Sequence, residues 1–180
     1  LPLYIAEVLL GYNGKMPEAY YLRHLCAFLL FYVSVCFFYL IVKNRFDSPW
    51  LGLVGCLFLV LSPRFFAESF YNKDIVFLSF FIISMYFFIR YLNKKTLMNT
   101  LLFALASALV MDQRITGLFI PFIAVVMAGI EELQTGRIIS GLHKRLLPLF
   151  VYLVSFSFFT VLFWPYLWTS PVKNFIGAFI

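Results

Sequence analysis

Residues 25–42 read LCAFLLFYVSVCFFYLIV, a run of eighteen residues without a charged side chain. A helix of about 20 mostly apolar residues crosses the roughly 30 Å hydrocarbon core of a bilayer. The predicted helix extends back past Arg23 and His24 to Leu22 and ends at Lys43-Asn44-Arg45, where a polar loop begins. This stretch therefore predicts a transmembrane helix over residues 22–42 and decides the class of protein to which the chain belongs.

The composition of the whole chain agrees with this assignment. Hydrophobic residues make up 63% of the 180 residues, charged residues only 12%, and the mean hydropathy is +0.95. A soluble domain carries about a quarter charged residues. The chain also has 24 Phe, 11 Tyr and 3 Trp, more aromatic side chains than one small core can bury. It is therefore predicted to be an integral membrane protein that uses lipid as the solvent for much of its surface.

Charged and polar clusters divide the chain into six apolar runs, each of which is predicted to form a helix. The runs cover residues 22–42, 50–61, 75–91, 97–111, 115–130 and 146–164. Pro121 is expected to kink the fifth run, whereas Pro148 falls in the first turn of the sixth, where proline is tolerated. A seventh run begins at Phe175. We interpret residues 1–180 as one all-α transmembrane helical bundle and as an internal piece of a longer polytopic protein.

The net charge of +6 does not indicate a nucleic-acid-binding protein. The basic residues lie in short loops rather than along one stripe, and no recognition motif accompanies them. Nucleic acid is therefore excluded as a partner. The three cysteines, Cys26, Cys36 and Cys56, lie inside apolar runs without the spacing of metal ligands, so we interpret them as packing residues.

Charge is distributed unequally between the two sides of the predicted helices. One side has eight basic and three acidic residues, a net charge of +5, and the other has six and five, a net charge of +1. Because cytoplasmic loops carry an excess of Lys and Arg, the first side is predicted to be cytoplasmic. It comprises the loops at residues 43–49, 93–96 and 131–145, together with Arg90 near the end of the third run. The outer side comprises the N-terminal stretch and residues 62–74, 112–114 and 164–173.

The outer loop from Ser62 to Asp74 has the strongest local indication of a functional site. It reads SPRFFAESFYNKD and combines two basic and two acidic residues with three Phe and one Tyr. Its ionic groups could bind a polar headgroup or a phosphate. Alternatively, Asn72 or Asp74 caps the following helix and Arg64 extends to the lipid headgroups. The two interpretations are compatible, and both stay open at this point.

Two other outer stretches contain polar candidates. Asp112-Gln113-Arg114 stands between the fourth and fifth runs and is followed by Thr116-Gly117. An arginine at the end of a helix can bind a phosphate through the N–H donors of its planar guanidinium group. The alternative is that Asp112 and Arg114 pair with each other or face water. Arg23-His24 at the outer start of the first run is a weaker signal, and His24 is interpreted as an interface residue.

The stretch from Trp164 to Pro171 reads WPYLWTSP and is typical of an aromatic belt at the depth of the lipid headgroups. As a functional element it could instead shape an opening for a lipid or a sugar.

At these stretches the chain resembles bacterial membrane glycosyltransferases of the GT-C type, in particular the protein O-mannosyltransferase and aminoarabinose transferase superfamily. The matching stretches are residues 20–25, 62–74, 112–117 and 164–171. The resemblance implies a multi-span enzyme of the bacterial inner membrane that takes a sugar from a polyprenyl-phosphate carrier. Transfer would occur on the non-cytoplasmic face, with inversion at the sugar carbon, to a lipid, glycan or protein acceptor.

The resemblance also implies roles for individual residues. Glu68 and Asp74 are similar to the second-loop carboxylates of the family, which serve the acceptor or a divalent metal. Arg114 is similar to the basic residue that holds the carrier phosphate. Further candidates for binding the phosphate or the substrate are Arg23, Arg64 and Asp112.

The acidic base of the family lies in its first outer loop, after the first span. The chain is expected to begin at the tail of that loop, and Glu7 and Glu18 do not stand in an acidic motif.

A transporter or flippase for a lipid-linked substrate is the alternative from a different functional class. Transporters usually place polar or charged groups near the bilayer midplane on broken helices, and the apolar runs contain almost none there. A non-catalytic membrane scaffold is a third interpretation, but it would not need the clustered outer charges.

Overall fold

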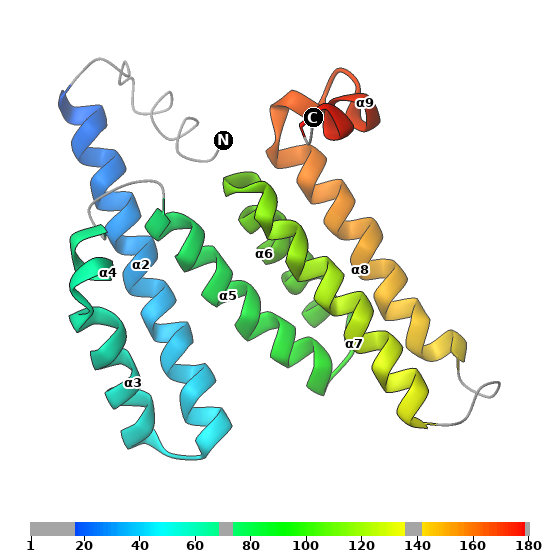
Figure 1. The fold of residues 1–180 in the computed structure, drawn as a ribbon, viewed down its shortest axis with the longest axis horizontal. Helices are drawn as coiled ribbons and strands as arrows, with labels where there is room; N and C mark the ends of the chain where they lie inside the picture. Colours follow the sequence, from blue (N-terminus) through cyan, green and yellow to red (C-terminus); the bar gives the residue numbers. More distant parts are fainter. Residues whose placement is uncertain (1–16, 69–73, 136–141, 179–180) are drawn as a thin grey trace. The chain divides into compact units, whose positions relative to one another are not determined.

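The structure, a computed structural model, describes residues 17–68, 74–135 and 142–178, and these form helices and no strand (Figure 1). The predicted all-α fold is confirmed. The chain divides into two compact units at Tyr86 and Phe87. The helices, in chain order, are α2 (Pro17–Phe46), α3 (Pro49–Leu61), α4 (Pro63–Glu68), α5 (Asp74–Asn93), α6 (Leu97–Gln113), the 3-10 helix η1 (Ile115–Leu118), α7 (Phe119–Thr135), α8 (Leu142–Phe163), the 3-10 helix η2 (Pro165–Leu167) and α9 (Pro171–Gly177).

Three helices among the described residues are long and apolar enough to cross a membrane. They are α2, α5 and residues Leu146–Phe163 of α8. The other predicted spans correspond to shorter apolar helices, of which α3 has 13 residues. A helix of that length rises about 20 Å, less than the hydrocarbon core. Crossing by α3, α6 and α7 therefore stays a prediction.

In the first unit, α2 and α3 form an antiparallel pair joined by a short turn (Figure 1). Asp47 has a φ of 49°, in the left-handed region that Asp tolerates better than most residues. The Ser48 hydroxyl then accepts a hydrogen bond from the Leu51 N–H at 3.5 Å, and Pro49 occupies the first helical position of α3. This local chemistry ends α2 and starts α3 within a few residues.

Close packing of α3 against α2 depends on Gly52. A Cβ atom at this position would stand 2.8 Å from the ring of Tyr39, closer than carbon atoms normally approach. Gly55, one turn further along α3, is also close to α2, because a Cβ there would lie 3.3 Å from the ring of Phe38.

The start of α5 packs against α2 in a small core. Ala27 and Phe31 of α2 are buried together with Ile75 and Val76 of α5. These four side chains place the first turn of α5 beside the N-terminal half of α2.

The core of the second unit lies between α6 and α8. The rings of Phe103 and Tyr152 are fully buried and stack with their centroids 4.4 Å apart and an interplanar angle of 9°. The Tyr152 hydroxyl donates to Ser107 Oγ at 3.3 Å, and Ser107 Oγ donates to the Phe103 carbonyl at 2.7 Å. Small residues such as Ala104 and Ala108 line the same buried face of α6. They allow the two helices to approach closely, as is usual for helix pairs in membranes.

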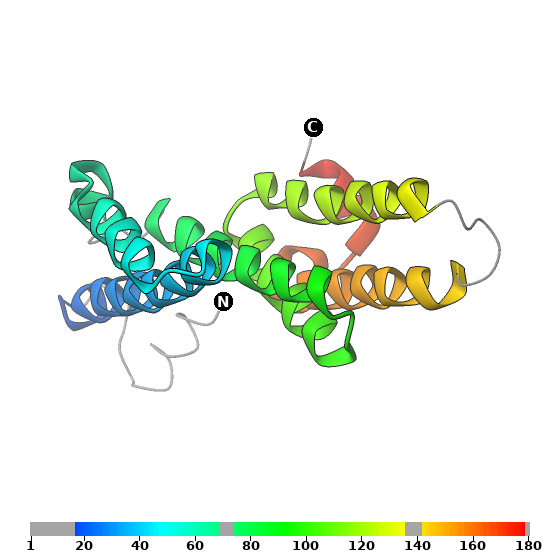
Figure 2. The same ribbon diagram turned by 90° about the horizontal axis from the view of Figure 1, so that it is seen from below.

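α7 lies beside α8 in this unit (Figure 2). The Lys95 ammonium forms an ion pair with Glu131, which ties the α5–α6 connection to the last turns of α7. The Asn99 side-chain amide donates to the Lys94 carbonyl at 2.9 Å and so provides a hydrogen-bond partner just after the end of α5. These contacts fix the end of the unit that was predicted to face the cytoplasm.

Three local predictions were wrong. Residues 63–68 of the predicted outer loop form the helix α4, because proline is favoured at the first position of a helix and PRFFAE has no later breaker. Pro121 is the third residue of α7, where its missing N–H is one of the unbonded donors, because η1 delays the start of that helix. Pro148 lies inside α8 rather than in its first turn, because the helix begins at Leu142 within the basic segment.

Candidate functional site

The first unit gathers four of the six candidate residues at one end. Arg23 stands one helical turn before Ala27, and Asp74 directly precedes Ile75, which packs in the same core. α3 runs back along α2 to this end and is followed by α4, which contains Arg64 and Glu68 (Figure 1). Residues far apart in the sequence thus share one end of the helical unit.

Arg64 and Glu68 form an ion pair across one turn of α4. Arg64 Nε lies 3.4 Å from Glu68 Oε1, and the side chains are 79% and 31% exposed. Exposed pairs of this kind contribute about 0–1 kcal/mol, so they open readily. In the structure Arg64 pairs with Glu68, and its expected contact with lipid headgroups or a phosphate stays a prediction. In the sequence the only indication of this pair is the i, i+4 spacing of Arg64 and Glu68, which brings two side chains together only when residues 63–68 are helical.

Asp74 is the first residue of α5 and the acidic residue of its first turn. Its negative charge is favourable there because the free N–H groups of a helix start carry partial positive charge. The position agrees with a structural role at the helix start and leaves a chemical role open. Asn72, the other residue considered as a cap, lies outside the described residues.

The other two candidates, Asp112 and Arg114, belong to the second unit, at the corner between α6 and α7. Arg114 ends α6 in an extended conformation, with φ −152° and ψ 139°, and its N–H donates to the Val110 carbonyl at 3.2 Å. Its side chain is exposed. Asp112 is half-buried, one residue beyond the predicted span, and accepts a 3.4 Å hydrogen bond from Gln113 Nε2. Burial raises the pKa of the Asp112 carboxyl above its usual value.

Gly117 makes this corner sterically possible. The residue is buried in η1, and a Cβ at its position would lie 2.7 Å from the Met111 nitrogen and 2.8 Å from the Met111 Cα. Backbone atoms of α6 cannot move aside as a side-chain tip can. The Gly117 N–H also donates to the Arg114 carbonyl at 2.9 Å. Glycine is therefore required to fold η1 back onto α6 and to hold Arg114 at the corner.

An apolar groove follows Arg114 directly along η1 and the start of α7. Its volume is about 370 Å³. The lining residues are Ile115, Thr116, Leu118, Phe119 and Phe122. Arg114 is exposed and directly precedes Ile115, the first residue of the lining. A cationic residue next to an apolar groove is suited to a ligand that joins an anionic group to a hydrocarbon chain.

The aromatic stretch after α8 folds into the turn η2 and the short helix α9. The Trp168 ring N–H donates to the Val161 carbonyl at 2.8 Å, which holds the turn against the end of α8. Asn174 Nδ2 donates to the Tyr166 carbonyl at 2.6 Å and to Thr169 Oγ1 at 3.1 Å. The sequence analysis missed Asn174, because nothing in its local pattern indicates that it would bond back to this turn.

A metal site is not evident in the part of the chain that the structure describes. No group of three or more His, Cys, Asp or Glu side chains comes together among those residues. Glu68 and Asp74 are the two candidate carboxylates at the end of the first unit.

Comparison with known proteins adds one finding. The family model described as dolichyl-phosphate-mannose-protein mannosyltransferase matches residues 10–164. No curated protein and no solved structure matches the chain.

Proposed function

The chain belongs to the dolichyl-phosphate-mannose-protein mannosyltransferase family, of the GT-C type, and from this premise we propose that it transfers a sugar from a polyprenyl-phosphate carrier. The acceptor is a lipid, a glycan or a protein. The site lies on the non-cytoplasmic face of the membrane, which for a bacterial protein is the outer face of the inner membrane.

The observation that carries this proposal is the apolar groove along η1 and α7, whose lining begins at the residue after Arg114. A polyprenyl phosphate combines a phosphate with a long hydrocarbon chain. In the proposed complex the Arg114 guanidinium binds the phosphate through two parallel hydrogen bonds, and the first part of the chain lies on Phe119 and Phe122. The positive charge of the guanidinium beside the phosphate also stabilises the phosphate as it leaves the sugar.

The carboxylates at the end of the first unit serve the acceptor. Glu68 binds the acceptor hydroxyl and helps to remove its proton as the bond to the sugar forms. Arg64 orients Glu68 through their ion pair, while Asp74 both starts α5 and assists at the acceptor or at a divalent metal. Arg23 and Asp112 are assigned to the binding of the substrate at the same membrane face.

A transporter is disfavoured by the polar residues inside the helices. Ser34, Ser79 and Ser107 are buried and donate to carbonyls of their own helices. They satisfy their hydrogen bonds locally and need no transported ion or substrate as a partner.

The sidedness of the site is a testable part of the proposal. A cysteine introduced at Gln134, in a background without Cys26, Cys36 and Cys56, should be labelled by an impermeant thiol reagent only after the cells are opened. A cysteine at Arg114 should be labelled in intact cells. The reason is the net charge of +5 against +1 on the two sides, which orients the helices during insertion. Labelling of the cysteine at position 134 from outside intact cells would contradict the predicted topology.

Arg114→Ala should weaken binding of the sugar donor about ten- to hundred-fold, because a hydrogen bond to a charged group contributes about 1.5–3 kcal/mol. Arg114→Lys should retain part of the affinity, since it keeps the charge and loses the planar fork. Donor affinity and transfer would be measured on the full-length protein with a polyprenyl-phosphate sugar.

The matched control for the two Arg114 variants is Arg90→Ala. Arg90 is an exposed arginine in the last turn of α5, at the predicted cytoplasmic end. This substitution removes the same charge and should leave donor affinity unchanged. Unaltered donor affinity and turnover in Arg114→Ala at normal expression would exclude the phosphate-binding role.

A further inference from the structure

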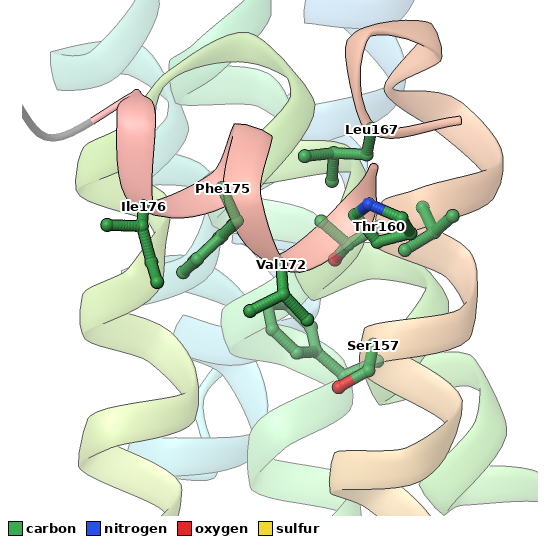
Figure 3. Close-up of a pocket in the computed structure, with 9 residues that line it drawn as sticks. Ser157, Thr160, Leu167, Val172, Phe175 and Ile176 are labelled. Atoms are coloured by element: carbon green, nitrogen blue, oxygen red, sulfur yellow. The ribbon is translucent and has the colours of Figure 1, made fainter. Parts of the chain in front are cut away.

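A small apolar pocket in the second unit is not used by the proposed transfer reaction. It lies between α8 and the segment formed by η2 and α9, with a volume of about 300 Å³ (Figure 3). Residues that line it include Ser157, Thr160, Leu167, Val172, Phe175 and Ile176. Its lining has no charged side chain.

Thr160 is the unusual residue of this pocket. It is 5% exposed, and its Oγ1 has no hydrogen-bond partner in the described part of the chain. Neighbouring Ser157 satisfies its hydroxyl by donating to the Leu153 carbonyl at 2.9 Å. Figure 3 shows the Thr160 side chain directed from α8 toward the lining residues of η2 and α9. A buried hydroxyl without a partner is costly, so an acceptor that entered the pocket would be held by it.

The position of the pocket suits a lipid. Thr160 lies one turn before the end of α8, and the stretch from Trp164 to Pro171, which is predicted to be an aromatic belt, follows directly. Such belts mark the boundary between hydrocarbon and headgroups. At the rim, Val172 is 74% exposed and Ile176 is also exposed, so the pocket opens to the surroundings through apolar side chains.

We propose that this pocket binds one acyl chain of a glycerophospholipid, whose ester carbonyl accepts a hydrogen bond from Thr160 Oγ1. Entry of the carbonyl requires a small shift of the residues around Thr160, because its Oγ1 is buried. A neutral donor among apolar residues matches a neutral ester carbonyl, a group that a polyprenyl phosphate lacks. The exposed Lys173, next to Val172 on α9, is available to the headgroup phosphate of the lipid. This binding site is independent of the transfer reaction, and the experiment that tests it measures only the binding of a phospholipid.

The test uses the full-length protein in vesicles of phosphatidylethanolamine and phosphatidylglycerol that contain a phospholipid with a diazirine in one acyl chain. After illumination, cross-links are expected on peptides that contain residues 156–161 and 171–176. Val172→Trp should remove them, because the larger side chain fills the opening from an exposed position. Val154→Trp makes the same change at an exposed residue of α8 outside the lining and should preserve them.

The hydroxyl is tested separately with a nearly isosteric change. Thr160→Val should lower cross-linking at limiting labelled lipid about fivefold, as expected for the loss of one neutral hydrogen bond, and Thr160→Ser should restore most of it. Equal cross-linking in Val172→Trp and Val154→Trp, or an unchanged signal in Thr160→Val, would overturn the proposal. So would displacement of the labelled phospholipid by polyprenyl phosphate but not by excess unlabelled phospholipid, since the pocket would then belong to the carrier.

Discussion

Glu68→Gln is expected to reduce sugar transfer by the full-length protein about 100-fold or more. A positioned carboxylate that takes part in proton transfer contributes about 10²–10⁴ in rate, and the amide cannot accept a proton. The substitution keeps the shape of the side chain. It also removes the exposed ion pair with Arg64, which contributes little to stability. Expression and thermal stability should therefore stay near wild type while turnover falls.

Asp74→Asn separates the two roles assigned to Asp74, which are starting α5 and assisting at the acceptor or a metal. Asn serves helix starts about as well as Asp, so the fold and most of the stability should be retained. We expect transfer to fall nonetheless, because Asp74 is assigned to both roles. Turnover would be measured with a polyprenyl-phosphate sugar and acceptor at saturating donor. Wild-type transfer rates in both Glu68→Gln and Asp74→Asn would remove residues 63–74 from the active site.

Gly117→Ala should destabilise the protein by about 3 kcal/mol, near the upper end of the usual cost of inserting a methyl group into a packed site. The added Cβ would lie 2.7 Å from the Met111 nitrogen, so either η1 or the end of α6 must move. Because η1 holds Arg114 at the corner, the donor affinity of the surviving folded protein should fall as well. Thermal unfolding in detergent and donor binding would measure the two effects.

Gly129→Ala provides the matched control on the next helix. A Cβ at Gly129 meets no atom within 4 Å, and the residue is exposed inside α7. Removing glycine from a helix interior should stabilise the protein slightly, by about 0.5–1 kcal/mol. Equal stabilities of Gly117→Ala and Gly129→Ala would contradict the packing of η1 on α6.

The membrane character, the all-α fold and most helix boundaries could be predicted from the sequence because they depend on local chemistry. An apolar run in lipid must satisfy its backbone hydrogen bonds internally, and a helix is the only way for one segment to do so. Charged clusters and the Asp47-Ser48-Pro49 turn then mark where helices end and begin. The polar stretches between the helices were predicted in the same way, because charges cannot lie within the hydrocarbon at low cost.

The buried faces of the helices could not be predicted, because these helices are apolar on nearly every side and their sequences do not distinguish a core face from a lipid face. Only the packed structure shows that Phe103 stacks on Tyr152, that Glu131 pairs with Lys95, and that Thr160 faces an apolar pocket. The first two of these contacts join residues far apart in the chain, and the third needs α9 to fold back beside α8, so all three exist only once helices pack. The need for glycine at position 117 has the same origin, since the atoms that exclude a side chain there belong to another helix.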